Sequence, residues 1–249
     1  MTFKDHFSQH AGEYARHRPT YPDELFAYLA SIAPDRALAW DCGTGNGQAA
    51  RGLARYFSLI IATDASAEQI QNAFPDERVT YRVGAEDAGP GPGSADLVTV
   101  AQALHWFDLD KFYEAAQLAL KPGGVLAVWA YSLCRISPGV DHILDSFYFG
   151  TVGPYWPKER VLIDDGYRTI PFPFDEIQPP EFSIRLDWSL NDLLAYLRTW
   201  SPTKRFIAAN GYDPVTLVED NLVREWGNAN EEKSVVWPLH IRVGKPRQP

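Results

Sequence analysis

The sequence predicts an α/β protein in which helices cover both faces of a doubly wound, mostly parallel sheet. Two observations predict this class. Between residues 37 and 131, short apolar runs alternate with stretches of helical composition. Most of those runs lack strict alternation of apolar and polar residues, which is typical of parallel strands buried on both faces. A repeated order of strand and helix implies right-handed crossovers, and hence a doubly wound sheet.

The elements of this part of the chain follow in order. Strands are expected at residues 37–41, 58–64, 79–83, 95–102 and 124–131. Helices are expected between them at residues 48–56, 67–73 and 109–120. The last of these helices should end at the KPGG sequence of residues 121–124, because proline and glycine stop helices. Two more helices are expected before the first strand, one at residues 7–16 and one opened by Pro22.

The chain after residue 131 predicts a cap. It holds five of the eight tryptophans and a tract rich in proline and aromatic residues, 171–180, that we expect to be ordered and extended. The remaining elements expected are a strand near 181–188, helices from Ser189 and Asp213, and a final strand at 234–243, where Pro238 indicates an edge or bulge. We therefore expect one domain with N-terminal helices (1–36), a core (37–131), a helical cap insertion (132–232), and a final strand with a tail (233–249).

Composition excludes several classes of protein. A net charge of -9 and a pI near 5.1 disfavour docking on nucleic acid or an anionic membrane. Cys42 and Cys134 make neither a disulfide framework nor a four-ligand zinc site, and His6 with His10 lacks a third metal ligand. The N-terminus is polar, and the longest apolar run is too short to span a bilayer. We expect a cytoplasmic monomer or homodimer without a metal.

A glycine-rich turn follows the first expected strand. Asp41 ends that strand, and Gly43, Gly45 and Gly47 precede a helix. Glycines at such a turn let the backbone approach a ligand and present amides at a helix N-terminus. The spacing departs from the dinucleotide fingerprint G-x-G-x-x-G, since Gln48 stands where the third glycine belongs. Asp41 would also repel a pyrophosphate, whereas it suits a ligand with an ammonium group and no phosphate, such as S-adenosylmethionine.

Carboxylates also end the next two strands. Asp64 comes 21 residues after Gly43, where a carboxylate can accept hydrogen bonds from both ribose hydroxyls, and Glu86 ends the third strand, where an adenine edge would lie. Each signal alone has a plainer interpretation: a structural turn, a helix N-cap at Asp64, or a solvated acidic pair at Glu86 and Asp87. Their occurrence in order on successive strands favours a ligand that contains a nucleoside.

These motifs carry a resemblance to a known family. The sequence DCGTGNG at 41–47, Asp64, the pair Ala85 and Glu86, and SADLVTVAQALHWFD at 94–108 resemble the successive motifs of class I S-adenosylmethionine-dependent methyltransferases. GAED and ALHWFD, the N-terminal YARHRPTYP and the C-terminal YLRTWSP are similar to the branch of trans-aconitate methyltransferase-like proteins. The resemblance implies a Rossmann-like sheet of seven strands.

The resemblance also implies roles for individual residues toward S-adenosylmethionine. Asp41, Gly43 and Gly45 would hold its methionine end. The ribose and its surroundings would fall to Asp64, Ala65 and Gln69, and the adenine to Ala85 and Glu86. Gln102 and Ala103 would pass under the sulfonium side, and Tyr14 would close over the cofactor.

His105 and Trp106 follow the fourth expected strand at its C-terminal end, where ligands bind in such sheets. His105 is the candidate catalytic residue, as a general base or as a donor to a substrate oxygen. The alternative is that it satisfies a backbone group and shapes the pocket. Trp106 is expected to be a pocket wall.

Further candidate contacts to a methyl acceptor are basic or aromatic. Arg18 lies in a basic cluster near the N-terminus, and Arg198 lies with Lys204 and Arg205 in another. Either cluster could receive a substrate carboxylate, although solubility and carbonyl capping are equally good explanations. Tyr131 and Trp200 complete the set, with cap core as the alternative for Trp200.

The sequence therefore predicts methyl transfer from S-adenosylmethionine to a small molecule. A carboxylate oxygen is the first expectation, because an ionised acceptor needs no base. A phenolic or amine acceptor is the alternative, and it would require His105 or a neighbour as the base. A module that binds S-adenosylmethionine without catalysis also stays open, whereas Asp41 and the glycine spacing disfavour a nicotinamide-dependent oxidoreductase.

Overall fold

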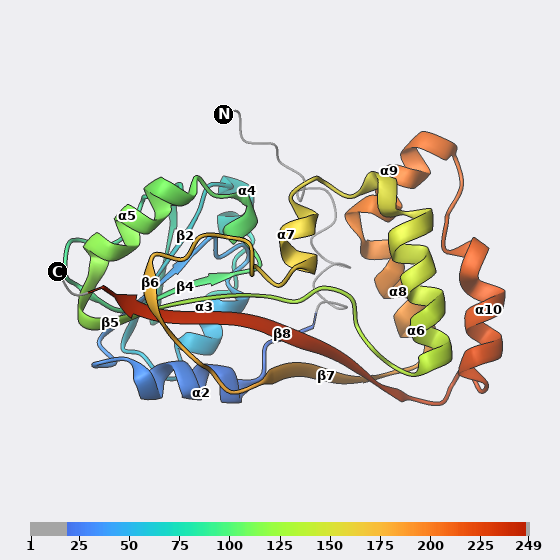
Figure 1. The fold of residues 1–249 in the computed structure, drawn as a ribbon, viewed down its shortest axis with the longest axis horizontal. Coiled ribbons are helices and arrows are strands. Elements are labelled where there is room, and N and C mark those ends of the chain that lie inside the picture. The colour runs from blue at the N-terminus through green and yellow to red at the C-terminus, as the bar shows by residue number, and fades with distance from the viewer. Residues whose placement is uncertain (1–18, 248–249) are drawn as a thin grey trace.

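The computed structural model describes residues 19–247 as a sheet with flanking helices, joined to a lobe of helices (Figure 1). The helix expected at residues 7–16 lies outside the described residues. The strands are β1 (Leu38–Cys42), β2 (Leu59–Asp64), β3 (Val79–Val83), β4 (Ala95–Ala101), β5 (Leu120–Ala130), β6 (Phe174–Ile177), β7 (Phe182–Trp188) and β8 (Lys233–Pro246).

The strand order confirms the predicted fold class. The order is β3-β2-β1-β4-β5-β8-β6, and β7 pairs with β8 beside this path. Strands β1 to β5 are parallel, while β8 is antiparallel to its neighbours. The sheet has eight strands instead of seven, because β6 forms within the extended tract predicted at residues 171–180. The order reverses between β1 and β4, and ligands of such sheets bind at the carboxyl ends of the strands at that point.

Helices cover both faces of the sheet, as the apolar strands require. On one face, α2 (Asp23–Ile32) and α3 (Gln48–Leu53) pack on Ala39 of β1. On the other face, α5 (Leu109–Ala119) packs on the neighbouring residue Trp40. Successive strand residues point to opposite faces, so one strand supplies both layers. The short helix α4 (Ala67–Gln71) follows β2.

The buried carboxylate of Asp96 connects three strands at the edge of the sheet opposite to the glycine-rich turn. Asp96 is 0% exposed, and its Oδ2 accepts hydrogen bonds from the amides of Ala37 and Leu38 at 3.0 and 2.9 Å. Its Oδ1 lies 2.6 Å from Nζ of Lys121. A buried carboxylate with this many donors is well compensated. Asp96 therefore fixes the amino ends of β1, β4 and β5 and has a structural role.

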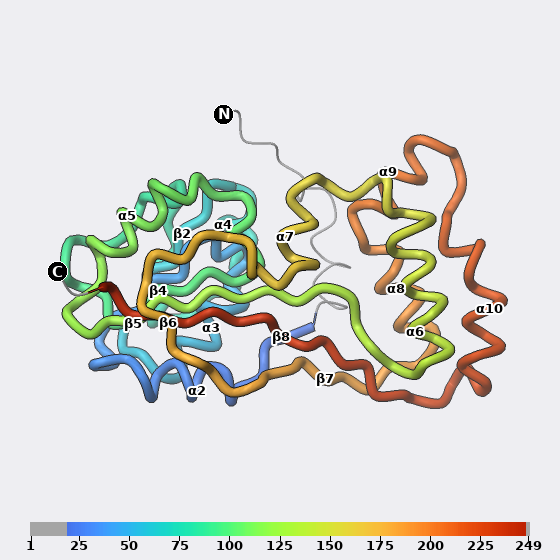
Figure 2. The backbone as a smooth tube through the Cα atoms, viewed as in Figure 1, coloured from blue at the N-terminus to red at the C-terminus, as the bar shows by residue number. Residues whose placement is uncertain are grey.

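The second lobe is the helical cap, which the tube in Figure 2 shows beside the sheet. It contains α6 (Pro138–Asp145), η2 (Ser146–Thr151), η3 (Gly153–Tyr155), α8 (Leu190–Thr199), α9 (Ser201–Asn210) and α10 (Thr216–Trp226). The short helix α7 (Arg160–Asp164) lies between these helices and the sheet. The predicted capping box of α8 is present, with Ser189 and Asp192 bonded reciprocally. The sequence prediction missed α6, α7 and α9. The extended Trp200 separates α8 from α9, which begins with Pro202 in its first turn.

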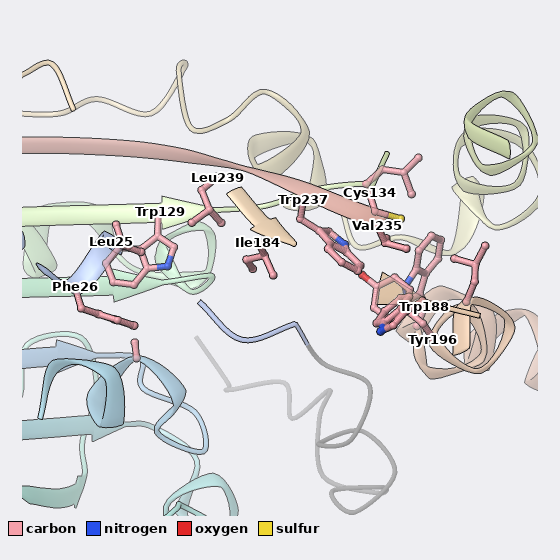
Figure 3. Close-up of a cluster of buried hydrophobic side chains, with 14 of the residues drawn as sticks. Leu25, Phe26, Trp129, Cys134, Ile184, Trp188, Tyr196, Val235, Trp237 and Leu239 are labelled. Atoms are coloured by element: carbon pink, nitrogen blue, oxygen red, sulfur yellow. The ribbon is translucent and has the colours of Figure 1, made fainter. Parts of the chain in front are cut away.

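A continuous core joins the cap to the sheet. Strand β8 is 14 residues long, and it pairs with β7 in its first half and with β5 from His240 onward. Side chains of this core run from Trp129 near α2 to Trp237 and Tyr196 at the cap (Figure 3). A shared strand and a shared core fix the orientation of the cap toward the sheet. Among residues 19–247, no helix has the length and apolar character needed to cross a membrane.

Candidate active site

The glycine-rich turn lies at the carboxyl end of β1, and its backbone conformation needs glycine. Gly43, Gly45 and Gly47 have φ values of 69°, 57° and 87°. A Cβ on Gly43 would come within 2.6 Å of Cβ of Ala103, and one on Gly47 within 2.2 Å of the Tyr81 hydroxyl. A Cβ on Gly45 would meet only Oε1 of Gln69, at 3.8 Å. The turn is thus packed against β3 and the segment after β4, whereas among residues 19–247 a Cβ on Gly45 would make only an ordinary contact.

Asp41 is a buried carboxylate that has no cationic hydrogen-bond partner among residues 19–247. It is 0% exposed, and it accepts hydrogen bonds from the hydroxyls of Thr44 at 2.5 Å and Thr99 at 2.8 Å. Burial raises its pKa to about 6, against the opposing effect of the two hydroxyls, and the nearby carboxylate of Asp64 raises it further. A cationic ligand at this turn would supply the missing opposite charge.

Asp64 ties the glycine-rich turn to the end of β2. One of its oxygens accepts a hydrogen bond from the amide of Gly45 at 2.8 Å, and the other accepts one from the amide of Ser66 at 2.8 Å. Burial raises the pKa of Asp64, and these two amides oppose the shift. Each carboxylate oxygen can still accept another hydrogen bond. The neighbouring Ala65 is exposed, and Gln69 on α4 is the side chain nearest the open face of Gly45.

The segment after β3 reaches the same edge of the sheet. Ala85 is exposed and Glu86 is half-buried. Oε1 of Glu86 accepts a hydrogen bond from the amide of Asp108 at 3.2 Å, and its carbonyl oxygen lies 3.7 Å from Sγ of Cys42. Glu86 therefore connects the segment after β3 with Cys42 of β1 and with Asp108, the N-cap of α5.

Gln102 has an unusual backbone and an unpartnered oxygen. It lies just after β4 with a φ of 57°, a conformation that costs a residue other than glycine about 1 kcal/mol or more. Its Nε2 donates to the carbonyl oxygen of Tyr131 at 2.9 Å, which joins the ends of β4 and β5. Its Oε1 is buried and has no hydrogen-bond partner in the described part of the chain. Such an acceptor is expected where a ligand with a donor binds.

His105 is buried and neutral. It lies in the short helix η1 (Leu104–Trp106), and its Nδ1 is 2.9 Å from the Tyr167 hydroxyl. Burial, and to a lesser extent the positive charge of Arg160, lower its pKa to about 3. Trp106 is 39% exposed, with its ring 4.7 Å from that of His105.

Known proteins with the same sequence pattern and fold identify the family. A model of the methyltransferase domain matches residues 40–128. A Dictyostelium discoideum protein named as a methyltransferase is 35% identical over 251 residues, which span 98% of this chain and 95% of that protein. A methyltransferase of Aspergillus candidus is 28% identical over 199 residues, or 69% of this chain and 62% of that protein. A structure described as a type II methyltransferase from Anaeromyxobacter dehalogenans has 42% sequence identity to this chain and a TM-score of 0.87. The match covers 92% of this chain and 99% of that chain.

This chain is a methyltransferase. S-adenosylmethionine is its cofactor, and the carboxyl edge of the sheet fits that molecule in three respects. Among residues 19–247, Asp41 has no cationic partner, a Cβ on Gly45 would clash with nothing, and the buried Oε1 of Gln102 lacks a donor. The assignment of each residue to the methionine, ribose or adenine part stays a prediction.

Of the remaining residues singled out in the sequence, four lie outside the part of the chain that the structure describes, and Trp200 lies in the cap. Tyr14, Arg18, His6 and His10 lie outside the described residues. Trp200 is buried in the cap, where its ring contacts those of Phe147, Tyr148, Trp156 and Tyr196. Among residues 19–247, no group of three or more potential ligands forms a metal site.

The contacts of one basic residue, Arg198, favour the structural alternative over a role in acceptor binding. Arg198 is not free to receive a substrate carboxylate, because its Nε lies 2.7 Å from Asp213 and its Nη2 lies 3.2 Å from Glu219. These two carboxylates, which flank the start of α10, already neutralise the guanidinium.

The sequence analysis missed several residues that shape the site. Thr44 and Thr99 hold Asp41, and Tyr167 holds His105 across 62 residues of sequence. Arg160 lies close enough to His105 to lower its pKa. Of these contacts, only the hydrogen bond from Thr44 to Asp41 could have been predicted from the sequence, because Thr44 lies within the glycine motif, three residues after Asp41. The others meet only through tertiary contacts.

Proposed function

We propose that this methyltransferase transfers the methyl group of S-adenosylmethionine to a carboxylate oxygen of a small molecule. The observation that carries the proposal is the state of His105. This imidazole is buried, its Nδ1 is engaged by the Tyr167 hydroxyl, and its pKa is lowered to about 3. An imidazole with so low a pKa is a weak base toward a neutral hydroxyl. An acceptor that is already ionised needs no such base.

For methyl transfer, the protein must mainly align the acceptor with the methyl group of the cofactor. The bound cofactor supplies a methyl group on a positively charged sulfur, which is strongly activated toward a nucleophile. Methyl transfer is an in-line displacement, so the side chains must hold the acceptor oxygen behind the methyl carbon and keep water out. In our proposal, Asp41, the glycine-rich turn and Asp64 hold the cofactor. The half-buried Tyr131 and the exposed Trp106 lie at the neighbouring strand ends, as walls for the acceptor.

Replacing His105 by Gln tests whether the acceptor needs a base. We expect the variant to keep kcat/KM for carboxylic acid acceptors within about fivefold of the wild-type value, because Gln can also bond to Tyr167. We also expect no inflection near pH 6.5 in the wild-type pH profile of kcat. The exposed His142 gives the matched control His142→Gln. A loss of about 10²-fold to 10⁴-fold in kcat at unchanged KM would contradict the proposal and favour a phenolic acceptor.

His105→Gln should also change how the stability of the protein depends on pH, which is a readout independent of activity. Burial lowers the pKa of His105 from 6.5 to about 3, so between these pH values the unfolded chain takes up a proton that the folded chain does not. The stability that the folded protein gains from a neutral His105 is fully present above pH 6.5 and is lost as the pH falls toward 3. His105→Gln should therefore reduce the loss of stability in acid, as measured by urea unfolding at pH 7 and pH 5.

A further inference from the structure

We propose that Arg160 binds a carboxylate of the methyl acceptor; this rests on the function proposed above. Arg160 begins α7, the short helix between the sheet and the helices of the cap (Figure 1). The core on which α7 packs, through Ile163, also includes Leu104 of η1. Arg160 is therefore close to the end of β4, where His105 lies, and its charge reaches that imidazole.

The guanidinium of Arg160 is held in one place before any acceptor binds. It stacks over the ring of Trp156, with its central carbon 4.4 Å from the ring centroid, and lies 5.3 Å from the ring of Tyr148. Its Nε donates a hydrogen bond to the Tyr148 hydroxyl and lies 3.4 Å from Oδ1 of Asp164. A guanidinium that is already ordered loses little conformational entropy when an anion binds.

Two nitrogens of the Arg160 guanidinium remain available to donate hydrogen bonds to a ligand. All polar contacts of Arg160 with residues 19–247 go through Nε, so its two terminal nitrogens have no partner there, and the side chain is 17% exposed. The indole Nε1 of Trp156, the ring on which Arg160 stacks, is buried and has no hydrogen-bond partner in the same range. The planar fork of an arginine matches a carboxylate, which it binds through two parallel hydrogen bonds. Unsatisfied buried donors also favour a polar ligand.

Arg160 differs in this respect from Arg242, another partly buried arginine of the region. Arg242 is also 17% exposed, but it donates to the carbonyl oxygens of Tyr167 and Ile170 and pairs with Glu176. Among residues 19–247, the one acid paired with Arg160 is Asp164, which is 26% exposed and also accepts a hydrogen bond from Tyr148 at 2.6 Å. Sharing with Tyr148 and exposure to water weaken its hold on the guanidinium. An acceptor carboxylate can therefore pair with Arg160.

The experiment compares Arg160→Gln with Arg168→Gln. Arg168 comes shortly after the end of α7, and its side chain is 80% exposed and pairs with Asp165. Its replacement by Gln removes the same positive charge, but from the surface. Calorimetry on the full chain with S-adenosylhomocysteine measures binding of glutarate and of its neutral analogue glutaramide. We expect the wild type and Arg168→Gln to bind glutarate more tightly than glutaramide. Arg160→Gln should lose about tenfold or more of the glutarate affinity and none of the glutaramide affinity.

Kinetics give a second readout. For the carboxylic acids that the wild type methylates, Arg160→Gln should raise KM with a smaller change in kcat, and Arg160→Lys should be intermediate, because it keeps the charge without the planar fork. If Arg160→Gln unfolds, Arg160→Lys carries the comparison.

The outcomes separate the two proposals. Unchanged glutarate affinity and KM in a folded Arg160 variant, in an enzyme that methylates carboxylic acids, would overturn the role of Arg160 alone. Equal wild-type affinity for glutarate and glutaramide would do the same. A wild type that methylates only neutral acceptors would overturn the proposed function as well.

Discussion

Asp41→Asn is expected to weaken cofactor binding and to stabilise the free methyltransferase at neutral pH. The carboxylate is fully buried between two hydroxyls, and within the described part of the chain no cationic group is among its hydrogen-bond partners. A bound S-adenosylmethionine would supply the opposite charge, which the amide of Asn cannot use. A charge-assisted hydrogen bond contributes about 1.5–3 kcal/mol, so the affinity should fall roughly 10-fold to 100-fold.

The stabilisation follows from the raised pKa of Asp41. Burial moves this pKa from 3.8 to about 6, so the folded protein holds a proton at a pH where the unfolded chain has lost it. The stability associated with the protonated form is present below pH 3.8 and is lost as the pH rises through about 6. A shift of about two pKa units corresponds to about 3 kcal/mol, which sets the upper limit of the gain in Asp41→Asn.

Two measurements check this prediction. Calorimetry with S-adenosylhomocysteine gives the affinity, and thermal unfolding of the free protein at pH 8 gives the stability, with about 2–4 °C expected for each kcal/mol. The exposed Asp110 gives the control Asp110→Asn, which changes neither quantity. A variant that loses stability and keeps its affinity would mean that Asp41 is a structural residue.

Gly43→Ala is expected to destabilise the methyltransferase by about 2–4 kcal/mol and to abolish cofactor binding. The new Cβ would lie 2.6 Å from Cβ of Ala103 and 2.9 Å from the ring of Phe107, at a φ of 69°. Relief of such overlap requires the turn to move away from β4, and backbone strain adds to the cost. The displaced turn no longer presents its amides beside Asp41.

Urea unfolding and cofactor titration of a double-mutant cycle test the cause. Ala103→Gly removes one of the two clashing partners, so the double variant should recover part of the stability that Gly43→Ala loses. The control is Gly91→Ala, because a Cβ there meets no atom within 4 Å. If Gly43→Ala binds the cofactor as tightly as the wild type, the turn is not the cofactor site that we describe.

The sequence predicted the sheet and the carboxyl edge well because their signals are local. Strands β1, β2 and β4 are mostly apolar runs of 5, 6 and 7 residues, Asp41 and Asp64 lie at the ends of β1 and β2, and Glu86 comes shortly after β3. Once the strands are known to be parallel, their ends must share one edge.

The cap was less predictable because its contacts join distant parts of the chain. Arg160 lies in a segment rich in charged and aromatic residues that carries no helical period, and its helix is only five residues long. Its stacking partner Trp156 and the pairing of His105 with Tyr167 exist only after the cap packs on the sheet. The aromatic residues after position 150 indicated a cap, but most of them, such as Trp200 and Trp237, form its core.

The most direct test of the account is the identity of the methylated product. The full chain is incubated with a metabolite extract and S-adenosylmethionine labelled in its methyl group, and products are separated by mass spectrometry before and after mild alkali. We predict labelled products that lose the methyl group as methanol in alkali, as methyl esters do. Label found only in alkali-stable ethers or amines, or in no small molecule at all, would contradict the account.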